Sequence, residues 1–299
     1  MKTKTLLVAM LGLVLGLVSA DTSAHAQSQP QSWVSGVGDD ANPCTRTAPC
    51  LTFAGAFSKT AAGGEIDCLD PGSFGTVTIT KAITVDCSGT LGLVQVSGTD
   101  GINVAAGAGD KVILRGLSLG GGVNGIDFTS GAQLSVERCR INGFSQDGIL
   151  INLSAAGAVY VTNTYITEVS DGIVAQTSAG ALTVTVNQTT IVNAAANGFH
   201  AAGGTIDVTI TNSIISKAGT NAVSGSAGSP QINVDSSTVS DSTTAFYSAS
   251  GTVIRVSNNN IYNDVTDFSI PKGGIIQSAS NNRITEGGTT SPTGKITLK

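Results

Sequence analysis

The feature that most constrains this sequence is an apolar residue that recurs every 22 to 25 positions. These residues, which we call the anchors, are Leu119, Ile141, Ile166, Ile191, Ile215, Val239, Ile261 and Ile284. A repeat of this length is typical of a solenoid, in which each repeat forms one coil that packs on its neighbours. The sequence therefore predicts one elongated domain.

Each anchor is preceded by two further apolar positions. Five positions before the anchors lie Leu114, Val136, Val161, Val186, Ile210, Val234 and Val256. Seven positions before them lie Val112, Leu134, Val159, Val184, Val208, Ile232 and Ile254. A period of two indicates a strand with one buried face, so we expect each set to form an interior column. In the last repeat Gln277 and Ala279 hold these positions, which indicates an atypical terminal coil.

A second strand follows a turn signal after the anchor. The signal reads Asn124-Gly125-Ile126, Asp147-Gly148-Ile149, Asp171-Gly172-Ile173 and Asn197-Gly198-Phe199, with degenerate copies at Asn221-Ala222-Val223 and Thr244-Ala245-Phe246. Gly, Asn and Asp are typical of turns, and each repeat is too short to include a long helix. Such strands can pair only with their equivalents in the next coil. The sequence therefore predicts an all-β parallel β-helix.

A polar column accompanies the apolar ones. Three positions before the anchors lie Asn163, Gln188, Asn212, Ser236, Asn258 and Asn281. Stacked amides can hydrogen-bond to one another along a solenoid, and Asn also tolerates a left-handed backbone. We expect these side chains, with Asn212 as the example, to face inward.

The N-terminus has the pattern of a secretory signal peptide. Lys2 and Lys4 precede an apolar run at 6–18, and Ala24-His25-Ala26 follows it. The run is shorter than a membrane span, and no later stretch is longer. We therefore expect a secreted or periplasmic protein without a membrane span, with a signal peptide at 1–26, an N-terminal cap at 27–64 and the coil at 65–299. The net charge of −5 without a basic cluster argues against nucleic-acid binding.

The cysteines agree with export. Cys44 and Cys50 flank a short polar loop, while Cys68 and Cys87 end two similar strand-like segments, so an oxidising compartment favours two disulfides. If those segments stack as neighbouring strands, Cys68 and Cys87 lie within bonding range. A zinc site lacks both a CxxC pair and a nearby His. Cys139 is expected to be a small buried thiol.

The N-terminal segment sharpens the assignment. Trp33 to Pro43, Ala48 to Ala56 and Ala62 to Ile66 resemble the capping segment of secreted bacterial right-handed parallel β-helix proteins of the pectate-lyase-like superfamily. The resemblance implies a right-handed coil closed at one end by a strand and a short helix. Thr52 can cap a helix at 53–61 that ends at Gly63-Gly64.

The superfamily includes pectate lyases, polygalacturonases and epimerases, but the fold alone assigns no reaction. The polygalacturonase motifs are absent: the only Asp-Asp pair is Asp39-Asp40, outside the middle coils. A calcium-dependent lyase needs several converging carboxylates, whereas the acidic residues here are scattered. We expect no cofactor and no metal, and calcium belongs only to the lyase alternative.

Asp147 and Asp171 are the best carboxylate pair, since equivalent positions in consecutive coils lie about 5 Å apart. That separation suits a retaining glycosidase, and Arg140 is the third candidate catalytic residue of this alternative. The alternative to catalysis is a structural role in a column of turn residues, because Asn124 and Asn197 occupy the same position in their coils. His200 is expected to be a lone surface imidazole.

The candidate ligand-binding residues are Tyr160, Tyr165, Arg138 and Arg140, which alternation places outside the coil. Aromatic faces with hydrogen-bonding groups suit sugars, although such residues also simply fill a sheet surface. We predict an exported, non-catalytic β-helix that binds a polysaccharide or cell-surface glycan or serves as an envelope component. The alternative is a polysaccharide lyase, hydrolase or epimerase acting on a bacterial or plant glycan.

Overall fold

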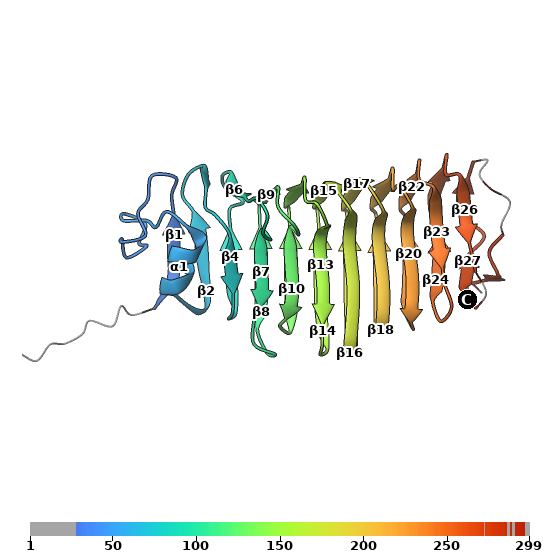
Figure 1. The fold of residues 1–299 in the computed structure, drawn as a ribbon, viewed down its shortest axis with the longest axis horizontal. Helices are drawn as coiled ribbons and strands as arrows, with labels where there is room; N and C mark the ends of the chain where they lie inside the picture. The colour runs from blue at the N-terminus through green and yellow to red at the C-terminus, as the bar shows by residue number, and fades with distance from the viewer. Residues whose placement is uncertain (1–27, 272, 286–287, 289–290, 297–299) are drawn as a thin grey trace, which may run out of the picture.

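The computed structural model describes residues 28–271, 273–285, 288 and 291–296. Its coils lie side by side along one long axis, from β1 and α1 at the N-terminal end to β27 at the C-terminal end (Figure 1). The predicted signal peptide at 1–26 lies outside the described residues. Among the residues that are described, no helix is long and apolar enough to cross a membrane.

Three faces of parallel strands form the coil, and the chain visits them in turn. The first face contains β1 (Gln29–Val34), β2 (Thr60–Cys68), β5 (Ile83–Asp86), β8 (Lys111–Arg115), β11 (Gln133–Glu137), β14 (Gly157–Thr162), β21 (Gln231–Asp235), β24 (Val253–Ser257), β27 (Ile275–Ser278) and β29 (Gly294–Lys295). The second contains β3 (Gly72–Ser73), β6 (Gly92–Gln95), β9 (Leu117–Gly120), β12 (Arg140–Asn142), β15 (Tyr165–Val169), β17 (Thr190–Ala194), β19 (Ile214–Ser216), β22 (Thr238–Ser240), β25 (Asn260–Tyr262) and β28 (Arg283–Ile284).

The third face contains β4 (Val77–Ile79), β7 (Ile102–Ala105), β10 (Ile126–Ser130), β13 (Asp147–Leu153), β20 (Asn221–Gly228), β23 (Thr244–Ser248) and β26 (Thr266–Ser269). Two long strands, β16 (Asp171–Asn187) and β18 (Asn197–Thr211), run from the third face into the first. The all-β parallel β-helix predicted from the repeat is therefore confirmed.

The interior columns follow the predicted register. Val136 pairs with Val161, Val161 with Val186, Val186 with Ile210 and Ile210 with Val234, and each is at most 1% exposed. The column seven positions before the anchors is likewise buried from Val112 to Ile254. Stacked aliphatic side chains thus make one continuous core along the axis.

The terminal coil departs from the expected register by one residue. Ile276, not Gln277, pairs with Ile254 and is fully buried. Gln277 lies outside, where its Oε1 accepts a 3.1 Å hydrogen bond from Arg255 Nε. The apolar column therefore continues one coil further than the sequence suggested, because the last repeat contains a one-residue offset before its anchor.

The prediction that the Asn-rich column faces inward is wrong. Asn163, Gln188, Asn212, Ser236 and Asn258 are exposed, with φ between 51° and 53°. They form the corner between the first and second faces, and Asn212 Nδ2 donates to Asn187 Oδ1 on the surface. The left-handed backbone explains the preference for Asn: one residue in this conformation turns the chain, so the residue after it points inward.

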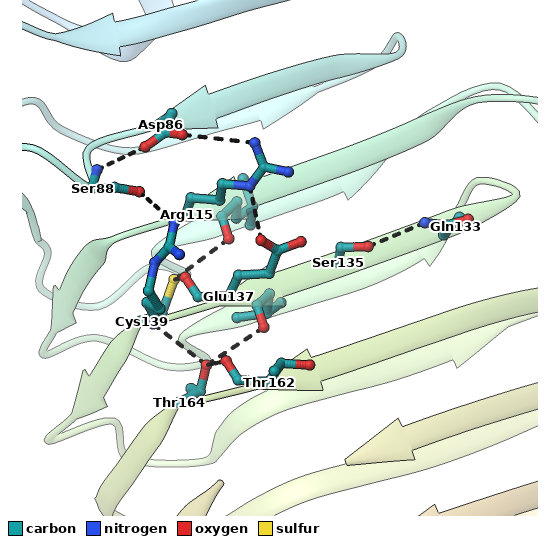
Figure 2. Close-up of polar contacts among 12 residues, drawn as sticks. Asp86, Ser88, Arg115, Gln133, Ser135, Glu137, Cys139, Thr162 and Thr164 are labelled. Carbon is teal, nitrogen blue, oxygen red and sulfur yellow. Dashed lines mark hydrogen bonds and ion pairs between the residues drawn. The ribbon is translucent and has the colours of Figure 1, made fainter. Parts of the chain in front are cut away.

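The inward polar ladder is formed by that next residue. It consists of Cys139, Thr164, Thr189, Ser213, Ser237 and Asn259, all buried. In each coil the side-chain oxygen accepts a hydrogen bond from the backbone N–H of the preceding coil, as in Thr189 N to Ser213 Oγ (3.2 Å) and Ser213 N to Ser237 Oγ (3.1 Å). Cys139 begins the ladder as a buried free thiol, and its N–H donates to Thr164 Oγ1 (Figure 2).

The N-terminal cap consists of β1 and α1 (Phe53–Lys59). Thr52 Oγ1 accepts a 2.9 Å hydrogen bond from Gly55 N, as the capping prediction requires. The helix ends two residues earlier than expected because Thr60 is already extended and begins β2.

Both expected disulfides are present. Cys44 bonds to Cys50, and Cys68 bonds to Cys87. The second pair follows directly from the register, since β2 and β5 pair in parallel up to Asp67 and Asp86. The two cysteines therefore leave neighbouring strands at the same level.

The polar ladder gives a first testable prediction. Thr189→Val keeps the shape of the side chain but removes the acceptor for Thr164 N in a closed site, while the Asn187 carbonyl keeps its hydrogen bond from Asn163 N. We expect a loss of about 1 to 3 kcal/mol in the free energy of unfolding. Guanidinium melts compare it with Thr183→Val on the exposed side of β16. Equal melting midpoints for the two variants would contradict the ladder.

A buried carboxyl group near the C-terminal end destabilises the folded state when it is ionised. Asp264 is 3% exposed, and its Oδ1 accepts a 2.8 Å hydrogen bond from Ser242 N, while Oδ2 has no partner. Burial raises the pKa of Asp264 to about 7, with smaller contributions of the same sign from Asp267 and Asp241. The folded state therefore favours the protonated form.

This predicts stability that falls with rising pH. The pKa of Asp264 in the folded state lies above the unfolded value of 3.8. The contribution of Asp264 to the free energy of unfolding therefore falls between about pH 4 and pH 7 and is constant above pH 7. Asp264→Asn keeps the acceptor for Ser242 and removes the charge, so at pH 8 we expect it to be more stable than the wild type by about 1 to 4 kcal/mol. At pH 4 the two should melt alike. Asp207→Asn, exposed on β18, is the control, and an unchanged pH profile in Asp264→Asn would refute the assignment.

Candidate functional site

The Tyr and Arg residues predicted to bind a ligand do not form one patch. Arg140 and Tyr165 pair on the second face, where the guanidinium carbon lies 4.9 Å from the centre of the Tyr165 ring. Tyr160 lies on the first face between Ser135 and Thr185. The corner at Asn163 separates the two groups, because the outward directions of the two faces differ.

Arg138 lies at the corner directly after β11, at the end of a charged row on the first face. Asp86, Arg115 and Glu137 form this row (Figure 2). Arg115 pairs with Glu137 at 2.8 Å and with Asp86 at 3.7 Å, and these three residues occupy the same register on consecutive strands. Arg138 donates a 2.9 Å hydrogen bond to Ser88 Oγ at the corner. The charges in this row are neutralised by one another, so the row has the character of cross-strand pairing.

Asp147 and Asp171 pair in register on β13 and β16. Asp171 Oδ1 accepts hydrogen bonds from Asn197 N (3.0 Å) and Asn197 Nδ2 (2.6 Å), and Asp147 N donates to Asn124 Oδ1 (3.1 Å). Burial, and after it the charge of Asp171, raises the pKa of Asp147 to about 6. The contacts are those of a turn column, in which Asp and Asn side chains link successive coils.

The glycines of the turn signal allow the coils to approach one another. A Cβ on Gly148 would lie 2.6 Å from Gly172 O and 2.6 Å from the Ile166 side chain. The same clash arises at Gly172 with Gly198 O and Ile191. The turn glycines therefore pack directly against the anchor side chains. This contact sets the position of the third-face strands that follow these glycines.

The acidic residues do not fit a calcium site. In the described parts of the chain, no group of three or more His, Cys, Asp or Glu side chains converges to hold a metal ion. Calcium takes six to eight oxygen ligands, and here Asp171 is engaged by Asn197 while Asp86 and Glu137 are engaged by Arg115. We derive no step that uses a metal.

A hollow lined by hydrogen-bonding side chains lies on the third face, around His200. It has a volume of about 480 Å³. Its lining consists of Asn197, His200, Thr220, Asn221, Ser224, Ser226, Thr244, Tyr247 and Ser269. We call it the His200 groove.

The walls and floor of the groove come from one outward row. His200 on β18 pairs with Ser224 on β20, which pairs with Tyr247 on β23. Two strand spacings place the backbones of His200 and Tyr247 roughly 10 Å apart. The His200 ring lies over β20, where it contacts Ser224 and Ser226, and Ser224 is only 1% exposed. Phe199, Val223 and Phe246 point inward between them and hold the strands on the core.

His200 is half-buried and held by two hydroxyl groups, so the expectation of a lone surface imidazole is wrong. Nδ1 lies 2.7 Å from Ser224 Oγ, and Nε2 lies 3.2 Å from Ser226 Oγ. Ser224 Oγ also lies 3.3 Å from the Phe199 carbonyl oxygen and 3.3 Å from Asn197 Oδ1, so this hydroxyl group links β20 to β18. Burial lowers the pKa of His200, partly opposed by Asp171, so the ring is neutral at neutral pH.

The groove could have been found from the turn signal. Counting three positions on from Asn197, Asn221 and Thr244 reaches His200, Ser224 and Tyr247 in consecutive coils. Each of these residues taken singly is an ordinary outward residue of a strand, and the Tyr and Arg residues of the other faces are the larger side chains. The relevant signal was the change from large to small to large along one outward row.

Comparisons with known proteins agree with this architecture. Residues 72–215 match the family model described as "Right handed beta helix region". The structure is similar to that of pectate lyase Pel9A, with a TM-score of 0.65 and 14% identity over 88% of this chain and 80% of the other. It is also similar to a rhamnogalacturonan lyase, with a TM-score of 0.57 and 12% identity over 77% and 73%.

A comparison with curated proteins finds no match. At the identities found among solved structures, similarity shows the fold and does not extend to activity. Together, the matched residues, the three parallel faces and the two similar structures show that the chain folds as a right-handed parallel β-helix.

Proposed function

We propose that this protein is exported and binds a polysaccharide in the His200 groove without cleaving it. The observation that carries the proposal is the row of His200, Ser224 and Tyr247, which leaves a hollow bounded by two rings and lined by hydrogen-bonding groups. Sugars present both apolar ring faces and hydroxyl groups, which match an aromatic ring beside hydroxyl and amide side chains.

The repetition of equivalent strands along the axis of the β-helix supports a polymeric ligand. Equivalent strands repeat along the axis, so a groove on one face is continued by the outward rows of the neighbouring coils. A chain of sugars lying along the axis can therefore contact several coils in succession. Ser269 on β26 already extends the lining one coil beyond Tyr247.

The chemistry of the lining supports binding without turnover. His200 and Tyr247 are its only titratable groups, and both ring nitrogens of His200 are engaged by Ser224 and Ser226. A glycosidase needs two carboxyl groups across the scissile bond, and a lyase needs a base at the sugar carbon from which the proton leaves. Neither arrangement is present in this groove.

Export is supported from two directions. The signal pattern at 1–26 was identified in the sequence. The disulfides Cys44–Cys50 and Cys68–Cys87 are typical of proteins that fold in an oxidising compartment.

A second function, a lyase, hydrolase or epimerase, is favoured by one observation. Burial and the charge of the neighbouring Asp171 raise the pKa of Asp147 to about 6, and a carboxyl group with a raised pKa can act as a general acid. Within the described residues, no hydrogen bond or ion pair connects Arg140 to this pair. New reducing or unsaturated ends that are lost in Asp147→Ala would support this function.

The binding proposal is tested with a glycan array and titration calorimetry on the mature protein. Tyr247→Ala and His200→Ala should each weaken binding of the best glycan about tenfold or more, because each removes one wall of the groove. Tyr262→Ala is the matched control, since Tyr262 lies on β25 of the second face. Equal affinity of all variants would place binding elsewhere, and no binding to any glycan would refute the proposal.

A further inference from the structure

We infer that the His200 groove takes uncharged sugars and rejects uronates, an inference that rests on the proposed glycan binding. It concerns the class of sugar and is decided by where the chain places its charges. It also departs from what the names of the similar lyases suggest, since pectate is a polyuronate.

The third face has no cationic side chain on any of its strands. The sequences of β4, β7, β10, β13, β16, β18, β20, β23 and β26 contain neither Lys nor Arg. The guanidinium groups lie on the other two faces, such as Arg115 and Arg255 on the first and Arg140 on the second. A carboxylate that enters the groove therefore meets no cation on these strands, and exposed Lys217 lies outside them, in the turn that precedes Thr220.

The same face carries fixed carboxyl groups close to the groove. Asp147 and Asp171 begin β13 and β16, and Asp127 lies on β10. Asp171 is hydrogen-bonded to Asn197, which itself lines the groove, and buried Asp267 lies on β26, the strand of the lining residue Ser269. The charge of Asp171 acts on the imidazole of His200. The potential in the groove is therefore negative.

These two facts decide between sugar classes. A uronate would bring its carboxylate beside Asp171, lose water and gain no cation, which is unfavourable on both counts. A neutral pyranose loses only hydroxyl hydration, and the hydroxyl groups of Ser226, Ser269 and Tyr247 can replace it. In the described residues no cluster is available to hold calcium as a bridge.

The test compares ligands that differ in charge alone. Tetragalacturonate is paired with the same tetrasaccharide after reduction of its carboxyl groups to alcohols, and cellotetraose with its C6-oxidised form. Calorimetry at low and high salt is run on the mature protein, with and without calcium. We expect each neutral form that binds to bind at least about tenfold more tightly than its uronate. The difference should narrow in high salt, because surface charges are then screened.

A charge variant tests the cause. Asp147→Asn/Asp171→Asn removes two carboxylates and places Asn where the column already has Asn124 and Asn197, so folding should be preserved and is checked by melting. It should raise uronate affinity several-fold and leave neutral sugars unchanged. Asp207→Asn, exposed on the first-face part of β18, is the matched control and should change neither.

The outcomes separate the two proposals. Uronates that bind as tightly as their neutral forms would overturn the selectivity while leaving glycan binding in place. Tighter binding of a chitosan tetramer than of cellotetraose would also overturn it, in favour of a cationic ligand. Absence of binding to every array glycan and every tetrasaccharide would remove the proposed function and the inference together.

Discussion

The structure depends on parallel strands that pair in register from coil to coil. Equivalent residues of successive coils lie next to one another, so a residue type that suits one position contacts its equivalents in the coils before and after it. The left-handed corner at positions such as Asn212 and the buried hydroxyl group that follows it, Ser213, make this register unique. A corner shifted by one residue would bury an amide without partners and expose the apolar columns. The core, the disulfide between Cys68 and Cys87 and the straight axis all follow from this constraint.

The inward positions therefore carry similar residue types in every coil, whereas the outward positions can carry different residue types from coil to coil and from face to face. On the first face the outward row is charged, with Arg115 between Asp86 and Glu137, and its members neutralise one another. On the third face the row changes from His200 to Ser224 to Tyr247 and leaves a hollow between its rings. One fold thus offers surfaces of opposite character, and the chemistry of a ligand decides which of them it can use.

Charge placement connects the groove to its proposed ligand. The carboxyl groups of the third face serve first as turn residues, since Asp171 holds the backbone and side chain of Asn197. Their field nevertheless extends into the groove, where it opposes the lowering of the His200 pKa. A structural column therefore also acts on ligand selection, because no cation on that face compensates for it.

The sequence by itself determined what repeats: the all-β coil, the interior columns from Val136 to Val234, the capping role of Thr52 and the pairing of Cys68 with Cys87. These features depend on spacing along the chain, and spacing is visible in a sequence. Only the tertiary structure decided what depends on direction. It turned Asn212 outward, separated Tyr160 from Tyr165 across a corner and brought His200 between two serines from the next coil. A single left-handed residue rotates everything after it onto another face, and contacts between coils arise only when that rotation has been fixed.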